Sequence, residues 1–280
     1  MVPSATAAAS AALLAALALP LAGDADPLSV FQPPQVRSVR PVDVSALRAL
    51  PALDQFGTIQ GTVSPGMDEP ESAAVASRDA GYALRLPSEL PAALSKDAHY
   101  RVTRSSRTSF TFSRAKAAQW ARQHNVALHP LPAGLDGATY TIALQPIAVV
   151  TYGAFSDEGS GHAVRTARFV AVVQGPVPTL TATGAPLRAL TDWFAAQPGI
   201  SKRLVAQIQA LGDPAQTIPI PVRFNEQTAS KIAVDGVQGL VIGDETGIGS
   251  AIVWTKAGRL YAVAGTLPQS EIVALANDLK

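Results

Sequence analysis

The sequence predicts an α+β fold in which antiparallel sheets carry helices on one face, after an N-terminal hydrophobic helix. Two observations lead to this prediction. Apolar residues recur with strand and helix periods in the order strand, helix, strands, helix, strands, unlike the regular alternation of parallel α/β folds. Residues 232–279 then add four short apolar runs and one amphipathic helix. The 280 residues can hold one large or two small domains, and we expect two similar α+β units, 56–155 and 156–280.

The N-terminal segment, residues 1–23, has no charged side chain, and Ala5–Ala22 is almost wholly Ala and Leu. A bilayer span needs about 20 apolar residues, so this run is borderline in length. We expect a membrane anchor, with a cleaved signal peptide and an Ala-rich soluble helix as the alternatives. The Pro-rich residues 24–55 predict an extended connector with a short helical stretch at Ser45–Leu50.

Residues 56–155 alternate between strand and helix signals. Alternating apolar and polar residues predict half-buried strands around Phe110 and around Tyr140, and Ser113 is placed to cap a helix that reaches His124. A second helix is predicted at Asp68–Ala80, with Asp68 as its cap and Gly81 beyond its end. The remaining predicted strands are Gly57–Val63, Tyr82–Leu86, Tyr100–Val102 and Ile147–Tyr152.

The next stretch begins with a flexible loop, Ser156–His162, and a strand at Arg168–Val173. Two helices follow, one marked by Leu187, Leu190 and Phe194 and the other by Leu204, Ile208 and Leu211, joined as a helical hairpin at Pro198–Gly199. The prolines in Ile218–Val222 predict an edge-type strand.

The C-terminal unit carries the strongest signals. Lys256–Arg259 is a tight turn in which Gly258 takes a positive φ. Thr266 and Gln269 have the spacing of a capping box at the start of the last helix, with Pro268 in its first turn. The apolar stripe of that helix is Ile272, Leu275, Ala276 and Leu279. The runs predicted to form an antiparallel meander are Ile232–Val234, Leu240–Ile242, Ala251–Trp254 and Leu260–Val263.

Glycines are frequent in this unit, yet they do not predict a phosphate loop. Such a loop opens directly into a helix and usually carries a Lys, whereas these glycines lie between strands and no GK[ST] follows. We therefore assign bulges and hairpin turns to Gly236, Gly239, Gly243, Gly247 and Gly249.

A pattern in the same unit resembles the extracytoplasmic domain of bacterial membrane-anchored proteins of the anti-sigma-factor type. The residues that carry it are Trp254, Gly258, Tyr261, Gly265, Glu271, Ala276 and Leu279. The connector, with Phe31 and its V-P-V-like run, is also similar to the juxtamembrane stretch of that family. The resemblance implies a location outside the cytoplasm more than any chemistry, and it covers no sigma-binding helical part.

Composition excludes several classes of function. The 22 Lys and Arg nearly balance the 21 Asp and Glu, so no concentrated basic field for nucleic acid is expected. The absence of Cys excludes disulfides, thiol catalysis and Cys-based metal sites.

Four sets of polar residues could carry chemistry, and each has a simpler interpretation. Asp157, Glu158 and His162 could bind a metal, although a flexible loop offers no rigid support for the ligands. Asp244 and Glu245 are adjacent, so in a strand they point to opposite faces. Neither a G-x-S-x-G nor an H-E-x-x-H pattern accompanies the histidines His99, His124, His129 and His162. Strand geometry disperses the arginines Arg101, Arg104, Arg107 and Arg114, which we interpret as solubilising surface charges.

The tryptophans Trp120, Trp193 and Trp254 are expected in the core. We thus expect no catalytic, cofactor-binding or metal-binding residues and no cofactor. The favoured hypothesis is a single-pass, membrane-anchored extracytoplasmic sensing domain that binds a peptide, lipid or protein and no nucleic acid. The alternative is a secreted or cell-envelope hydrolase that gathers His162, Asp157 or Asp244 with a nucleophile.

Overall fold

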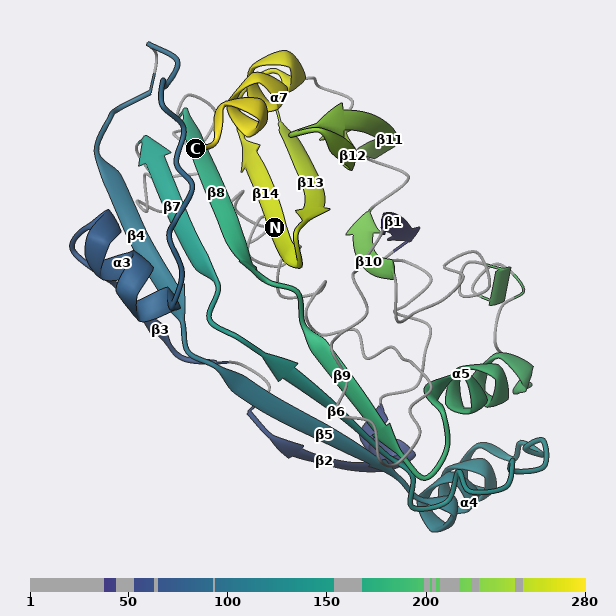
Figure 1. Ribbon diagram of the computed structural model, residues 1–280. Helices are drawn as coiled ribbons and strands as arrows, with labels where there is room; N and C mark the ends of the chain where they lie inside the picture. Colours follow the sequence, from purple (N-terminus) through teal and green to yellow (C-terminus); the bar gives the residue numbers. More distant parts are fainter. Residues whose placement is uncertain are drawn as a thin grey trace, which may run out of the picture.

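The computed structural model describes residues 38–43, 53–62, 65–92, 94–153, 168–198, 202, 205–206, 217–222, 227–244 and 249–280. These residues form a mixed α+β fold with two antiparallel sheets and four helices (Figure 1). The eight-stranded sheet has the order β11 (Gln227–Val234), β12 (Val237–Asp244), β13 (Ser250–Lys256), β14 (Arg259–Gly265), β8 (Phe169–Pro176), β7 (Ala148–Gly153), β4 (Ala98–Thr103) and β3 (Met67–Asp68). The four-stranded sheet has the order β2 (Gly57–Gly61), β5 (Ser106–Phe112), β6 (Thr139–Leu144) and β9 (Thr179–Thr183). A short parallel pair joins β1 (Ser38–Asp43) to β10 (Thr217–Val222).

The two large sheets are halves of one bent ribbon. Three stretches of chain run through both sheets, because β4 continues into β5, β6 into β7 and β8 into β9 (Figure 1). The register stays unbroken across the bend. Val102 of β4 pairs with Ala148 of β7. Four residues after Val102 and four residues before Ala148, Ser106 of β5 pairs with Leu144 of β6. The sheets therefore meet at a bend without an inserted residue.

Side chains replace missing ladder partners at this bend. The Tyr82 hydroxyl donates to the carbonyl of Gln174 at 2.6 Å and accepts from the N–H of Ala148 at 3.1 Å. Thr103 Oγ1 accepts from the N–H of Ile147 at 2.9 Å. Gly175 has no room for a side chain, since an added Cβ would lie 2.9 Å from the Ile147 side chain. The bend is thus closely packed and its backbone polar groups are satisfied.

The eight-stranded sheet is buried on both faces. The helices α7 (Gln269–Asp278) and α3 (Ala73–Ala80) lie on one face, where Trp254 is fully buried beside Ile272. Between the two helices, residues 82–92 and Leu94 lie on the same face, where Leu84, Leu86 and Leu94 add to the core. On the opposite face, where β1 runs against β12 and β13, the buried residues are Ile147, Val173, Leu240, Ile242, Val253, Leu260 and Ala262.

The four-stranded sheet has its own core beneath α4 (Arg114–His124) and α5 (Leu187–Ala196). Phe56 packs against Trp120 and Trp193, with ring centroids 5.1 and 6.2 Å away. Trp193 and Trp254 are buried and Trp120 is half-buried, which confirms core packing as the role of the tryptophans.

Most of the predicted elements are confirmed. All four runs of the C-terminal meander are strands, and the last helix packs its predicted stripe into the core. Ser113 caps α4 by accepting from the N–H of Lys116, and Ile218–Val222 lies in β10. The turn at Lys256–Arg259 has positive φ at both Ala257 and Gly258.

Three local predictions are wrong. The helix predicted at Asp68–Ala80 begins only after Ser72, its N-cap, because Asp68 pairs with Val102 in β3. Thr266 does not cap α7; its hydroxyl accepts from the N–H of Phe169, and the N-cap is Pro268.

The third correction concerns residues 82–86, predicted as a strand. This segment lies on the face of the sheet, and the Gln174 side chain takes the place of a neighbouring strand. Gln174 Oε1 accepts from the N–H of Arg85 at 2.9 Å, and Gln174 Nε2 donates to the Arg85 carbonyl at 2.8 Å. A segment on a sheet face buries alternate residues as a strand does, so the apolar pattern is the same.

Several expectations fall outside the described residues: the hydrophobic segment 1–23, the loop Ser156–His162 and most of the second helix of the predicted hairpin, of which only residues 202 and 205–206 are described. Among the described helices, none has the length and apolarity to cross a membrane. Each of the two large sheets contains strands from 56–155 and strands from 156–280. The division of the chain into these two units stays a prediction.

The bend provides a stability test. In the Tyr82→Phe variant, the buried N–H of Ala148 and carbonyl of Gln174 lose their partner, which we expect to lower the free energy of unfolding by about 2 kcal/mol. Tyr140→Phe is the matched control, because the Tyr140 hydroxyl lies 3.5 Å from the Pro186 carbonyl, at the limit of a hydrogen bond, and its loss should cost less than about 1 kcal/mol. Urea unfolding curves measure both values. Equal losses in the two variants would contradict the role given to Tyr82.

Candidate functional site

The residues predicted to carry acidic chemistry are only partly placed. Asp157, Glu158, His162 and Glu245 lie outside the described residues, and Asp244 is the last residue of β12, opposite Gln227. Within the described ranges, no group of three His, Asp or Glu residues could hold a metal ion. The hydrolase alternative therefore stays a prediction.

The other histidines lie on separate elements and are exposed. His99 is on β4, His124 ends α4, and His129 lies in the segment after that helix. His124 stacks on Trp120 with ring centroids 4.5 Å apart, and its Nδ1 lies 2.9 Å from the Trp120 carbonyl oxygen. The helix ends at Asn125, which has a left-handed backbone and donates its N–H to the carbonyls of Ala121 and Arg122.

The arginine series is dispersed over the surface, as the strand geometry predicts. All four side chains are exposed, and three form ion pairs that water screens, so each pair contributes little to stability. The pairs are Arg101 with Glu69, Arg104 with Asp68 and Arg114 with Asp136.

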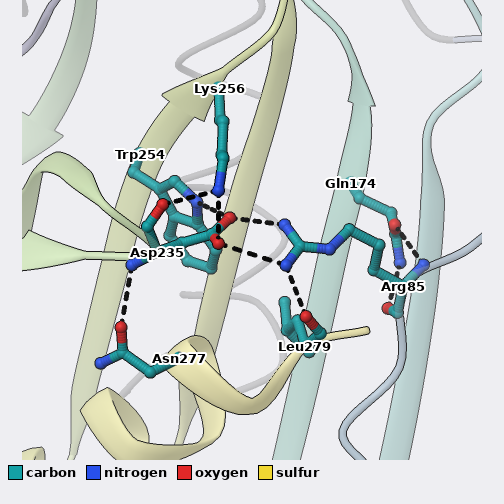
Figure 2. A network of polar contacts seen from close by, with 7 residues as sticks. All are labelled: Arg85, Gln174, Asp235, Trp254, Lys256, Asn277 and Leu279. Carbon is teal, nitrogen blue, oxygen red and sulfur yellow. Dashed lines mark hydrogen bonds and ion pairs between the residues drawn. The ribbon is translucent and has the colours of Figure 1, made fainter.

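Among the described residues, the densest charged cluster is centred on Asp235, at the turn between β11 and β12 (Figure 2). Val234 pairs with Val237, which leaves Asp235 and Gly236 as a two-residue turn. Both have positive φ, 50° and 76°, as a type I′ turn requires. Asp and Gly are the residues that tolerate this backbone, so the sequence places the Asp235 carboxylate at the turn.

Four donors meet the Asp235 carboxylate. Both terminal nitrogens of Arg85 donate to it as a fork, Lys256 Nζ donates at 2.7 Å, and Trp254 Nε1 lies 3.4 Å away. Its backbone is also committed, because its N–H donates to Asn277 Oδ1 at 2.8 Å and its carbonyl accepts from Lys256 Nζ at 2.7 Å. Figure 2 shows how these groups converge from the turn, from β13, from α7 and from the segment containing Arg85.

Arg85 extends the cluster to the end of α7 and to the bend. Its guanidinium also donates to the carbonyl of Leu279 and lies over the Tyr261 ring, 5.3 Å from the ring centroid. The backbone N–H and C=O of Arg85 are hydrogen-bonded to the Gln174 side chain. A single residue thus links the turn, the sheet face and the bend of the ribbon.

The electrostatics keep Asp235 ionised near neutral pH. Partial burial opposes ionisation, but the hydrogen bonds from Arg85 and Lys256 outweigh it and lower the pKa of Asp235 to about 2. A carboxylate with this pKa is a poor proton acceptor near neutral pH, and its oxygens are already occupied by donors. We therefore assign the Asp235 cluster a positioning role that holds residues 82–86 and the end of α7 to the sheet.

Sequence reasoning did not identify this cluster. The Asp-Gly dipeptide between two apolar runs indicates the turn, but Arg85 lies 150 residues away in the chain and no local signal connects it to Asp235.

Comparisons with family models, with curated proteins and with solved structures find no match to this chain.

The charge of Asp235 predicts a pH dependence. Because its pKa is lowered in the folded chain, its stabilising contribution is present above pH about 4 and lost as the pH falls towards about 2. Asp235→Asn should lower the free energy of unfolding at pH 7 by about 1–2 kcal/mol. The difference between wild type and variant should shrink between pH 4 and pH 2, as measured by urea unfolding.

Asp192→Asn is the control, since Asp192 forms an exposed pair with Arg188 and should change stability by less than about 0.5 kcal/mol. A wild-type advantage over Asp235→Asn that is equal at pH 7 and pH 2 would show that the carboxylate charge plays no part.

Proposed function

We propose that the protein is a membrane-anchored extracytoplasmic interaction domain that binds an extended segment of a partner protein along the free edge of β11. The hydrophobic N-terminal segment, the Pro-rich connector and the resemblance of the C-terminal unit support the location. The edge of β11 supports the binding role, and it is the observation on which the proposal depends.

β11 ends the eight-stranded sheet on one side, and no described strand lies beyond it. In a hairpin closed by a two-residue turn, the pair next to the turn exchanges hydrogen bonds, and the pairs then alternate. Val234, Ile232 and Ser230 therefore bond to β12, whereas the N–H and C=O groups of Ala233, Lys231 and Ala229 point away from the sheet. An extended peptide can add to a sheet as a further strand by hydrogen-bonding to such a row of outward N–H and C=O groups.

The side chains along this edge suit a regulated contact. Lys231 and Ser230 are exposed, and an edge Lys discourages indiscriminate pairing between sheets. Ile232 packs against the core and anchors the strand, so the edge is held in an extended form before a partner arrives. A preformed edge costs less conformational entropy on binding than a disordered one.

Cysteine labelling tests the location, because the chain has no native Cys. Ala74 is an exposed position in the first turn of α3, and Ala76 in the same helix is fully buried. In intact cells, we expect Ala74→Cys to react with a membrane-impermeant maleimide and to remain with the membrane fraction.

Ala76→Cys should react only after denaturation, which controls for loss of structure. Reaction of Ala74→Cys only after lysis would place the domain inside the cell and reject the proposal.

A pair of substitutions tests the edge. Lys231→Pro removes an outward N–H and leaves the ladder with β12 intact, whereas Lys231→Ala removes the same charge and keeps the N–H. Peptides selected from a displayed random library on the wild-type domain should bind Lys231→Pro at least about tenfold more weakly, with Lys231→Ala close to wild type.

Thermal unfolding of both variants verifies that they fold, and Ala233→Pro repeats the test at the next outward N–H. Selected peptides that bind Lys231→Pro as tightly as wild type would rule out strand addition at β11.

A further inference from the structure

β2 forms one edge of the four-stranded sheet, and no described strand lies beyond it. Phe56, the residue before β2, accepts from the N–H of Ser113 and so forms a bonded pair with it. Bonded and non-bonded pairs alternate along an antiparallel ladder, so the N–H and C=O of Ile59 point away from β5. In agreement, the carbonyl of Gly57, two residues before Ile59, accepts from Lys116 Nζ. The backbone of Ile59 thus presents a donor and an acceptor at the edge of the sheet.

The side chains of β2 are exposed as well. All residues from Thr58 to Gly61 are open to solvent, and Ile59 is 41% exposed. Among the described residues, the one other large hydrophobic side chain with such exposure is Met67, on β3. β2 carries no charged residue and no proline. It therefore lacks the features with which proteins usually keep a sheet edge from pairing.

The other described edges of the two large sheets have such protection. β3 is two residues long and includes the charged Asp68. β11 carries the exposed Lys231. β9 is half-buried at Thr179, Leu180 and Ala182. Of these four edges, β2 is thus the one that is both uncharged and exposed along almost its whole length.

The sequence of β2 is nearly symmetric about Ile59. Polar Thr58 and Gln60 flank the isoleucine, and Gly57 and Gly61 lie outside them. A two-fold axis requires this symmetry, because the same surface must fit itself on both copies. In an antiparallel pair of β2 strands centred on Ile59, the two isoleucines lie opposite each other on one face. On the other face, Thr58 lies opposite Gln60 of the second copy, so apolar groups meet apolar groups and polar groups meet polar ones.

We propose that two copies of this chain pair through β2, antiparallel and with the two-fold axis at Ile59. The pairing joins the two four-stranded sheets into one continuous sheet. Each Ile59 N–H donates to the Ile59 carbonyl of the other copy, and the two side chains cover each other. The same arrangement at β11, centred on Lys231, would place two like charges face to face. Charge therefore directs self-association to β2, and the inference does not depend on binding at β11 or on a membrane anchor.

The size of the contact predicts a weak dimer. β2 is five residues long, and a strand of this length spans only about 17 Å. A strand pair of this size buries well below the roughly 800 Å² that each partner buries in a stable complex. We therefore expect monomers at micromolar concentration and dimers as the concentration approaches the millimolar range.

Cysteine pairs test the register, because the chain has no native Cys. In the proposed dimer, position 58 of one copy and position 60 of the other form a non-bonded pair with Cα atoms about 4.5 Å apart, which a disulfide can bridge. Two copies of one variant place their cysteines about 8 Å apart, which is too far. Oxidation of a mixture of Thr58→Cys and Gln60→Cys should therefore form the mixed disulfide at least about tenfold faster than either variant alone forms its own.

Sedimentation velocity over the same concentration range tests the edge itself. Ile59→Lys places like charges face to face and should weaken self-association at least about tenfold. Met67→Lys is the matched control, because it puts the same charge at the other exposed hydrophobic side chain and should dimerise as the wild type does. Lys231→Pro should also dimerise as the wild type does, which separates this result from binding at β11.

Thermal unfolding verifies that the variants fold, and the cysteine experiment decides alone if Ile59→Lys does not. Wild-type protein that stays monomeric up to millimolar concentration would overturn the inference. Equal weakening by Ile59→Lys and Met67→Lys, or a mixed disulfide that forms no faster than the others, would do the same.

Discussion

Residues 82–86 lie on a sheet without belonging to its ladder, so their backbone polar groups need other partners. Burial of an unpaired N–H or C=O costs more than a typical hydrogen bond contributes, so this requirement constrains the surrounding structure. Gln174 satisfies the backbone of Arg85, and the Tyr82 hydroxyl satisfies the bend beneath it. Gln174 is almost fully buried, which makes its pairing with Arg85 a necessity for this packing.

The same segment connects a neutral network to a charged one. On the neutral side, Tyr82 and Gln174 bond to buried backbone, and burial raises the pKa of Tyr82 to about 12, so the hydroxyl keeps its hydrogen. On the charged side, Asp235 receives Arg85 and Lys256 close to the surface. The neutral network is insensitive to pH over the physiological range, whereas the charged network depends on ionisation only under acidic conditions. Arg85 belongs to both, through its backbone in one and its guanidinium in the other.

Sequence patterns predicted the elements that depend on local chemistry. The meander runs of the C-terminal unit, the strands around Phe110 and Tyr140, and the capped helix after Ser113 all follow from periodicity and capping. The wrong predictions arose where a distant residue decides the outcome. Asp68 pairs with a strand instead of capping a helix, and Thr266 bonds to Phe169. The Asp235 cluster was out of reach for the same reason, since its partners come together only in the folded chain.

The unbroken register of the bent ribbon has a consequence for how the chain folds. β12, β13 and β14 join sequence neighbours and can form locally, whereas the ladder between β14 and β8 joins segments that are far apart in the sequence. Closing long loops before the contacts form slows folding. Because β6 continues into β7 and β8 into β9 without a change of register, the pairing of β7 with β8 also aligns β6 with β9. One pairing register therefore serves both large sheets.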